Sequence, residues 1–419
     1  MFTKWQWLFD KLRRTVSARV SVYVLMALFT ALVAIPLQSI TFPETISVAA
    51  ESVDSILNIL ASSMLAVTTF SLSVMVSAFS AASATATPRA TRLIQEDPTT
   101  HRVLGTFIGA FLFSLVGMIA LSMDIYNDSG RIILFAVTIA LVVIIVATIL
   151  NWIEHLTSLG RVGETTDRVE SAATRALKLR IQYPHLGGKY LDHENPPDYL
   201  SQTVMPVSTG YIQHIDMNCL QELAAEHEIE ISVLKTPGSF VHPANAVAAY
   251  GGEASEALEK CIAAAFTIDT HRSFDQDPRF GLEVLTEIAS RALSPAVNDP
   301  GTAIDVIGRS VRLLDIWKDH ACLRDDDENI RFPGVRVPAL RIQDLFDDVF
   351  LPIARDGAGM LEINVRLLKS LQSLKQLSGG TFDESVAHHV RVIVARAEKA
   401  LITDEEKQVV RNLAESIAR

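Results

Sequence analysis

Four apolar stretches in the first 152 residues constrain the fold more than any other feature of this chain. They run from about Arg19 to Gln38, Val53 to Ala82, Val103 to Met123 and Arg131 to Trp152. A helix needs about 20 residues to cross a hydrocarbon core about 30 Å thick, and the central part of each stretch carries no Asp, Glu, Lys or Arg. Because a bilayer leaves backbone groups no other partner, we expect four transmembrane α-helices.

The remainder of the chain has a different composition and predicts a separate soluble domain. Of the 37 Lys and Arg residues nine precede Ile153, and of the 48 Asp and Glu residues eight do, which leaves 28 basic and 40 acidic side chains beyond it. An acidic domain repels phosphate backbones, so we expect no nucleic-acid partner. The isolated Cys219, Cys261 and Cys322 lack metal-ligand spacing, and we interpret them as reduced core residues.

The charges of the connections predict the orientation in the membrane. Four basic residues precede the first stretch and Arg19 begins it, and Arg89, Arg92 and Arg102 lie in the second connection. The first connection has no Lys or Arg, and the third has only Arg131, at its end. Since Lys and Arg mark the cytoplasmic side, we expect both termini in the cytoplasm.

We therefore expect an α-helical membrane protein with four transmembrane helices, followed by a mixed α+β cytoplasmic domain. The expected parts are an interfacial N-terminal helix (1–17), a four-helix transmembrane domain (18–152), a helical stalk and loop (153–204), a small β-rich module (205–252) and a helical domain (253–419). Apolar residues at helical spacing beside lysines and arginines suit an N-terminal helix in the headgroup layer.

The second stretch is unusual because small hydroxyl side chains recur along it at intervals of mostly three or four. Read as one helix, it carries these residues as a stripe along one face: Ser55, Ser62, Thr69, Ser73, Ser77 and Ser80. Such a stripe permits close packing of another helix. It can also line a hydrated path at the centre of an oligomer, where hydroxyls solvate a passing ion without trapping it.

Arg89 and Arg92 follow this stretch, just beyond Pro88. If the stripe lines a pore, the two arginines ring its cytoplasmic mouth and favour anions. Their alternative role is that of ordinary positive-inside anchors, which requires no pore.

Two Asp-Pro pairs open helices in the carboxy-terminal part. Asp277-Pro278 and Asp299-Pro300 each combine a capping carboxylate with a proline at the first helical position. The short polar joint between the two helices predicts either structural capping or a contact with a ligand or another subunit. The candidates for that contact are Arg272, Arg279, Arg291, Asn298, Asp299 and Thr302.

No motif in the carboxy-terminal part predicts catalysis, a cofactor or a metal. Residues 153–419 contain no Gly-rich phosphate loop, metal-ligand spacing or nucleophile elbow, so we expect no enzyme. The adjacent His388 and His389 point in different directions on a helix and do not form a metal pair. Thr381 with Glu384, and Thr403 with Glu406, predict capping boxes.

The chain resembles predicted bacterial membrane proteins of the domain-of-unknown-function family 2254. The matching pieces are Thr87-Pro88-Arg89, Val103-Leu104-Gly105-Thr106-Phe107, Gly210-Tyr211-Ile212, Pro237-Gly238-Ser239-Phe240-Val241, Gln276-Asp277-Pro278-Arg279-Phe280-Gly281 and the run from Arg291 to Pro300. Such proteins usually have Asp and Gly where this chain has Ser239 and Ala296. The resemblance implies an architecture and no settled activity.

Two functions fit these patterns. The first is a homo-oligomeric channel or pore, in which the second helix faces the axis and the cytoplasmic domain regulates. The alternative is a sensor or scaffold that the helices merely anchor in the lipid bilayer, without transport activity.

Overall fold

A computed structural model describes residues 21, 24–25, 29, 50–95, 97–123, 128–158, 160–192, 201–318 and 330–418. The chain divides into two compact units. The described residues up to Thr165 form the membrane unit, and those from Thr166 onward form the carboxy-terminal unit. The predicted interfacial helix (1–17) and almost all of the first predicted span (Arg19 to Gln38) lie outside the described residues.

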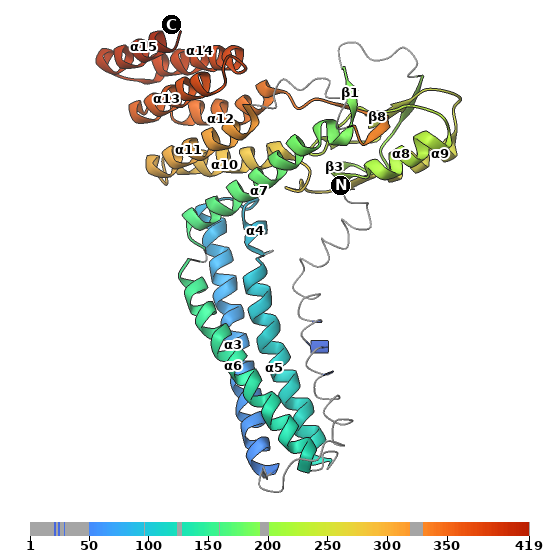
Figure 1. Ribbon diagram of the computed structural model, residues 1–419. Coiled ribbons are helices and arrows are strands. Elements are labelled where there is room, and N and C mark those ends of the chain that lie inside the picture. The colour runs from blue at the N-terminus through green and yellow to red at the C-terminus, as the bar shows by residue number, and fades with distance from the viewer. Residues whose placement is uncertain are drawn as a thin grey trace. The chain divides into compact units, whose positions relative to one another are not determined.

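Three helices long and apolar enough to cross a membrane form the described part of the membrane unit (Figure 1). They are α3 (Ala50–Thr85), α5 (Pro98–Ser122) and α6 (Asp128–Ser158). At 1.5 Å per residue, even the 25-residue α5 is about 37 Å long, more than a hydrocarbon core requires. These helices correspond to the second, third and fourth predicted spans.

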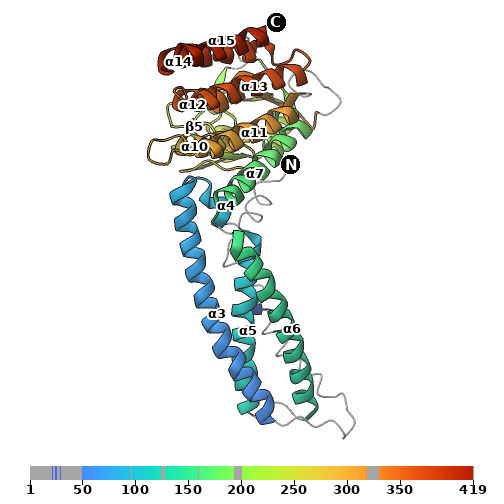
Figure 2. The same ribbon diagram turned by 90° about the vertical axis from the view of Figure 1, so that its left-hand side faces the viewer.

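Helices α3, α5 and α6 run side by side (Figure 2) and pack through apolar side chains. One cluster joins Val53 and Leu57 of α3 to Phe113 of α5 and Leu134 of α6. The absence of a side chain at Gly117 allows this approach, because a Cβ there would lie 3.0 Å from a methyl group of Leu57. Close contact of small residues is how helices associate in lipid, where no hydrophobic force drives them together.

The helix after the last span is a separate element, which corrects the predicted stalk at 153–204. Helix α6 ends at Ser158, and α7 (Val162–Gln182) begins after a break. Gly160 lies in the break with a φ of +82°, a conformation that interrupts a right-handed helix. The later part of 153–204 also contains strands β1 (Gly188–Leu191) and β2 (Gln202–Val204).

Two sheets form the β-rich module of the carboxy-terminal unit. The larger has the strand order β1-β8-β4-β6-β2 and adds β4 (Ile231–Val233), β6 (Ala248–Tyr250) and β8 (Phe332–Pro338) to the two strands above. The smaller has the order β5-β3-β7, from β3 (Gly210–Ile215), β5 (Phe240–Val241) and β7 (Phe266–Asp269). Helices α8 (Met217–Glu226) and α9 (Glu256–Ala264) pack against the strands.

The module extends beyond the predicted boundaries at 205–252. Strand β8 lies between β1 and β4 and runs parallel to both, although it follows β4 by about 100 residues. Strands β1 and β2 precede residue 205, and β7 follows residue 252. Short strands that pair across long stretches of chain have no local sequence signal that indicates their partner.

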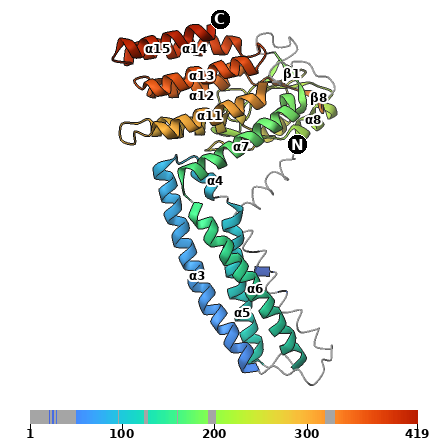
Figure 3. The same ribbon diagram turned by 60° about the vertical axis from the view of Figure 1, so that its left-hand side comes forward.

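Six helices form a layered stack after the sheets (Figure 3). They are α10 (Pro278–Ala292), α11 (Pro300–Trp317), α12 (Ile342–Asp356), α13 (Leu361–Leu377), α14 (Asp383–Ala400) and α15 (Asp404–Ala418). Helix α12 packs between α10 and α14, and α13 packs between α11 and α15. Two rows of helices therefore run through the layers, an arrangement that resembles stacked helix pairs of α-solenoids.

The helix boundaries test several local predictions. Asp277 and Asp299 cap α10 and α11, and Thr403 and Glu406 form the predicted capping box, with two hydrogen bonds of 3.3 Å. The box predicted at Thr381 is wrong, because α14 begins at Asp383 and its N-cap is Phe382, which has no capping oxygen. Cys261 is exposed, which corrects its interpretation as a core residue.

Candidate functional site

The hydroxyl stripe of α3 is uncovered by the other described helices. All six of its predicted members are exposed in the protomer: Ser55, Ser62, Thr69, Ser73, Ser77 and Ser80. The residues that α3 buries form the opposite side of the helix and include Val53, Leu57, Leu60, Met64, Met75, Ala78 and Ala82. With 3.6 residues per turn, the two sets lie about half a turn apart. The packing of α3 against the other described helices therefore leaves the stripe uncovered.

The exposed side of helix α6 carries large apolar side chains and no comparable stripe of hydroxyls. Its exposed large side chains are Ile139, Val143, Ile144, Val146, Leu150 and Ile153. On α3 the exposed large side chains, which include Leu65, Phe70 and Val76, lie beside the stripe. The exposed face of α3 is thus a strip of hydroxyls between apolar edges.

Several stripe hydroxyls donate hydrogen bonds to their own helix. Ser62 Oγ donates to the carbonyl of Asn58 at 2.9 Å, Thr69 Oγ1 to Leu65 at 2.9 Å, and Ser77 Oγ to Ser73 at 3.0 Å. These bonds satisfy the hydroxyl donors without an outside partner. Each oxygen retains a lone pair that can accept a bond from water or coordinate a cation.

Arg89 and Arg92 follow the end of α3 but differ in exposure. Arg89 is exposed before the short helix α4 (Thr91–Gln95), and its backbone N–H donates to Thr87 Oγ1 at 3.1 Å. Arg92 lies within α4 and is half-buried. Both remain candidates for a cytoplasmic mouth as well as for anchors.

A buried polar contact joins the start of α5 to the end of α6, and sequence reasoning missed it. Asp97 caps α5 by accepting hydrogen bonds from Thr100 N and Oγ1 at 2.8 and 2.6 Å. The same carboxylate oxygen lies 2.9 Å from Nε2 of His155 in the last turn of α6. The Asp97-Pro98 pair is a capping signal like Asp277-Pro278, but nothing in the sequence indicates that His155 is its partner.

Three of the family-like sequence pieces meet at one place in the carboxy-terminal unit, which we call the signature junction. Ile212 of β3 exchanges backbone hydrogen bonds with the Pro-Gly turn, donating to Ser239 and accepting from Gly238. Gln276 Oε1 accepts the backbone N–H of Ile215 at 3.0 Å. Gly238 has a φ of +92° and lies directly against Asp277. The junction thereby connects the smaller sheet to the start of α10.

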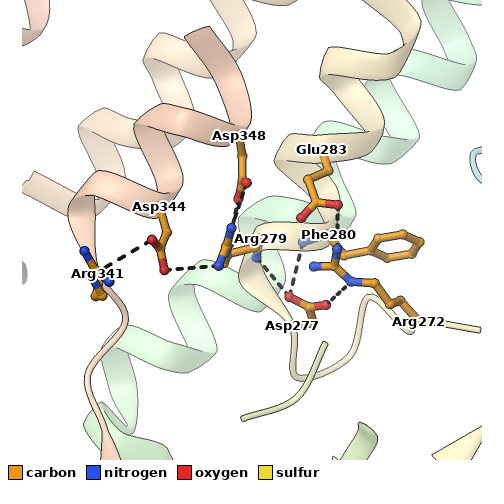
Figure 4. A network of polar contacts seen from close by, with 8 residues as sticks. All are labelled: Arg272, Asp277, Arg279, Phe280, Glu283, Arg341, Asp344 and Asp348. Atoms are coloured by element: carbon orange, nitrogen blue, oxygen red, sulfur yellow. Dashed lines mark hydrogen bonds and ion pairs between the residues drawn. The ribbon is translucent and has the colours of Figure 1, made fainter. Parts of the chain in front are cut away.

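Asp277 is the buried centre of the junction (Figure 4). Its Oδ1 accepts the backbone N–H groups of Arg279 and Phe280, and its Oδ2 accepts Arg272 Nε at 2.7 Å. Arg272 also pairs with Glu283. Burial raises the pKa of Asp277, although Arg272 opposes that shift. The arrangement is a closed polar network in which every oxygen of the carboxylate has a partner.

Arg279 extends the network to α12 (Figure 4). Its Nε and Nη2 donate to the two oxygens of Asp348 at 2.7 and 2.8 Å, and its Nη1 donates to Asp344 at 3.1 Å. Arg341 lies 4.0 Å from Asp344. The bidentate pair fixes the first helix of the stack to the third.

The six predicted contact residues separate into two groups at opposite ends of α10. Arg272 and Arg279 lie at its beginning, in the network of Asp277. Arg291 lies in its last turn, and Asn298, with a φ of 50°, belongs to the loop that follows. Asp299 there accepts bonds from Thr302 N and Oγ1 at 3.1 and 2.6 Å. Because α10 is 15 residues long, about 21 Å separates the groups, so they do not form one site.

Arg180 is a buried residue that sequence reasoning missed. It lies in the last turn of α7, is only 5% exposed and lines a small cavity with Gln276. Burial lowers its pKa to about 10, against the opposing field of Asp277. A basic residue in the last turn of a helix is common. Its spacing of four from Ala176 and three from Leu177 places it on the buried face of α7 and is the signal that could have found it.

The described residues contain no cluster of three or more His, Cys, Asp or Glu side chains that could hold a metal ion. His389 is fully buried, with Nδ1 2.7 Å from the carbonyl of Ser385 and Nε2 3.1 Å from Asp347. His388 is half-buried, and its ring stands edge-on to that of His389 with the centroids 5.1 Å apart.

Three apolar helices of membrane-spanning length, joined to a mixed α/β unit, define a membrane protein. Its sequence places it more narrowly. The chain belongs to the family of predicted membrane proteins with the domain of unknown function DUF2254, which matches residues 13–373 and confirms the resemblance of its motifs.

Relatives with sequence similarity include uncharacterised proteins of Mycobacterium tuberculosis and Mycobacterium bovis. Each is 30% identical over 251 residues, which cover 57% of this chain and 47% of the relative. The chain thus spans about half the length of the curated relatives it matches. No solved structure matches it.

Proposed function

We propose that this membrane protein assembles into a homo-oligomeric pore in which the hydroxyl stripe of α3 lines a hydrated path. The observation that carries the proposal is the exposure of all six stripe residues on the side of α3 opposite its packing face. A helix surface that only touches lipid needs nothing but large apolar side chains, as on α6. A strip of hydroxyls between apolar edges suits a helix that meets water along one line and neighbouring helices on both sides of it.

A symmetric assembly supplies the path that one protomer does not enclose. In a ring, each copy contributes one α3, and the apolar edges around Leu65 and Phe70 contact the adjacent copies. With both termini in the cytoplasm of a bacterial inner membrane, Arg89 and Arg92 lie at the inner mouth and favour anions. The carboxy-terminal unit has a regulatory and not a catalytic role in this proposal.

The second candidate is a membrane-anchored sensor or scaffold without transport. The hydrogen bonds that Ser62, Thr69 and Ser77 donate to their own helix favour it, because they allow the stripe to lie in a dry contact. In that case a packed helix covers the stripe, and the described packing face of α3 is unaffected.

Cysteine accessibility separates the two candidates. In a variant without the three native cysteines, one cysteine at a time replaces Ser73 on the stripe, Met75 on the packing face and Ile144 on the lipid-like face of α6. A membrane-impermeant thiol reagent should modify the Ser73→Cys protein and leave the Met75→Cys and Ile144→Cys proteins unmodified. Unreactive cysteines at Ser73 and Thr69, with disulfide cross-linking of two copies through Thr69→Cys, indicate a dry contact and support the scaffold.

Conductance tests the pore directly. Purified protein in planar bilayers should carry current, and the Ser73→Leu and Ser77→Leu substitutions should reduce it strongly because each places an apolar side chain in the path. Val146→Leu on α6 is the matched control and should leave the current unchanged. Absence of current in the wild-type protein, or equal currents in all variants, contradicts the pore.

A further inference from the structure

Helix α7 pairs two of its three carboxylates with the helical stack. Asp167 pairs with Arg309 of α11, and Glu170 pairs with both Arg309 and Arg312. Arginines of another helix thus offset this negative charge, and the charge on the outward side of α7 is set by its other residues.

Basic side chains lie along the outward side of α7. Arg161 directly before the helix, and Arg175 and Lys178 within it, are exposed and have no ion-pair partner among the residues that the structure describes. The half-buried Arg168 continues the row. Because 3.6 residues make one turn, positions 161, 168 and 175 lie nearly above one another, with 178 beside them. The buried residues on the opposite side include Val169, Ala173 and Leu177.

The outward side of α7 is therefore a basic surface on an acidic part of the chain. The third carboxylate, Glu164, is half-buried on the same side, so four cations and one acid leave a net charge of +3. Residues 153–419 as a whole have 28 basic and 40 acidic side chains. A surface of opposite sign to its surroundings attracts an anionic partner.

Chain continuity places this surface next to a bilayer. Helix α6 is long and apolar enough to cross the membrane and ends at Ser158, and Arg161 is only three residues further on. Three residues span at most about 11 Å, so Arg161 lies near the headgroup layer. Basic residues that directly follow a transmembrane helix are attracted to anionic lipids, by about fivefold in affinity for each Lys or Arg near the surface.

We infer that the basic side of α7 binds the anionic headgroups of the bilayer that α6 crosses. Arginine suits this ligand, because a guanidinium group can donate two parallel hydrogen bonds to a phosphate. Arg161, Arg175 and Lys178 have no ion pair with another described residue to give up when they bind. The inference needs the span α6 but no pore, so it is independent of the proposed function.

Fluorescence of the full chain in lipid nanodiscs tests the inference. In a variant without the native cysteines, Ser171→Cys on the exposed side of α7 carries an environment-sensitive fluorophore, and acrylamide serves as an uncharged quencher. Compared with phosphatidylcholine alone, nanodiscs that also contain phosphatidylglycerol should shift the emission to the blue and protect it from acrylamide. The protection should disappear at about 1 M salt, where the Debye length is about 3 Å. The same fluorophore at Ala387→Cys, exposed on α14, should respond alike in both lipids.

Charge substitutions locate the surface. Arg161→Gln, Arg175→Gln and Lys178→Gln together should remove the protection by phosphatidylglycerol, because three losses of about fivefold reduce the affinity roughly 100-fold. The matched control removes three exposed cations of α13 and α14 and should retain the protection: Arg366→Gln, Lys369→Gln and Lys399→Gln. All six side chains are exposed, so both triple variants should unfold at the same temperature as the wild-type protein.

Two results overturn the inference directly. One is equal quenching at Ser171→Cys with and without phosphatidylglycerol, and the other is protection that persists in the triple glutamine variant of α7. Protection that is equal in both lipids and grows with the number of copies in each nanodisc also contradicts it, because another copy of the chain then covers this side of α7.

Discussion

The backbone of Gly238 lies against the carboxylate of Asp277 so closely that a side chain at Gly238 would overlap it. The two residues come from different sequence pieces, a turn before β5 and the N-cap of α10. Gly238 also has a φ of +92°, which L-residues rarely adopt. Two independent constraints thus require glycine where the smaller sheet meets the helical stack.

Gly238→Ala should therefore lower the free energy of unfolding by about 2–4 kcal/mol, because it combines backbone strain with overlap in a closed network. Thermal or denaturant unfolding in detergent measures the loss. The control is Gly308→Ala in α11, where a Cβ meets nothing within 4 Å. That change should be neutral or slightly stabilising. Similar effects of the two substitutions would show that the contact with Asp277 is unimportant.

Arg279→Lys should destabilise the protein by about 1–3 kcal/mol although it preserves the charge. A lysine supplies one point charge and cannot make the bidentate contact with Asp348 while reaching Asp344. Arg355→Lys is the control, since the Arg355 side chain is 63% exposed and pairs with Asp356 alone. Its effect should stay below about 0.5 kcal/mol. Hydrogen exchange at the start of α12 should rise only in Arg279→Lys.

Glu170→Gln should weaken the attachment of α7 to α11. Glu170 accepts Arg312 through both oxygens, at 2.8 and 2.9 Å, and Arg309 Nη1 at 2.7 Å. We expect a loss of about 1–3 kcal/mol, because two arginines lose an ionic partner. A double-mutant cycle with Arg309→Gln should give a coupling of at least 0.5 kcal/mol. Strict additivity would mean that Glu170 and Arg309 do not stabilise each other. Asp315→Asn, outside this contact, should be additive with Glu170→Gln.

Acid should destabilise the stack at α14 through His389. Burial lowers the pKa of His389, and the Ser385 carbonyl and Asp347 oppose this shift only in part. The unfolded chain therefore binds the proton more readily. Above about pH 6.5, the ordinary pKa of histidine, His389 is neutral in both the folded and the unfolded chain, and the protein keeps its full stability. The protein loses stability as the pH falls from there toward the lower pKa of His389 in the folded state.

Hydrogen exchange of α14 measures this loss between neutral pH and about pH 5. Exchange, corrected for its intrinsic pH dependence, should rise in the wild-type protein as the pH falls. The rise should be absent in His389→Gln and unchanged in His227→Gln, whose exposed side chain lies at the end of α8. If exchange in His389→Gln rises with acid as it does in the wild type, another titrating group causes the effect.

The sequence alone determined those features that depend on neighbouring residues. Long apolar runs identify α3, α5 and α6, because a segment that crosses the hydrocarbon core must be apolar and about 20 residues long and must satisfy its own backbone hydrogen bonds. The spacing of hydroxyls placed the stripe on one side of α3, and Asp-Pro pairs marked the starts of α10 and α11 to within a residue. Each of these signals is contained within one or two turns of chain.

Tertiary structure alone decided which distant residues meet. Strand β8 lies between β1 and β4, Gly238 lies against Asp277, and Arg180 is buried beside Gln276. It also decided that the packing face of α3 is the one opposite the stripe. Such contacts form only when segments tens of residues apart come together, and they depend on which surfaces are then covered. The spacing of residues within one segment does not indicate either.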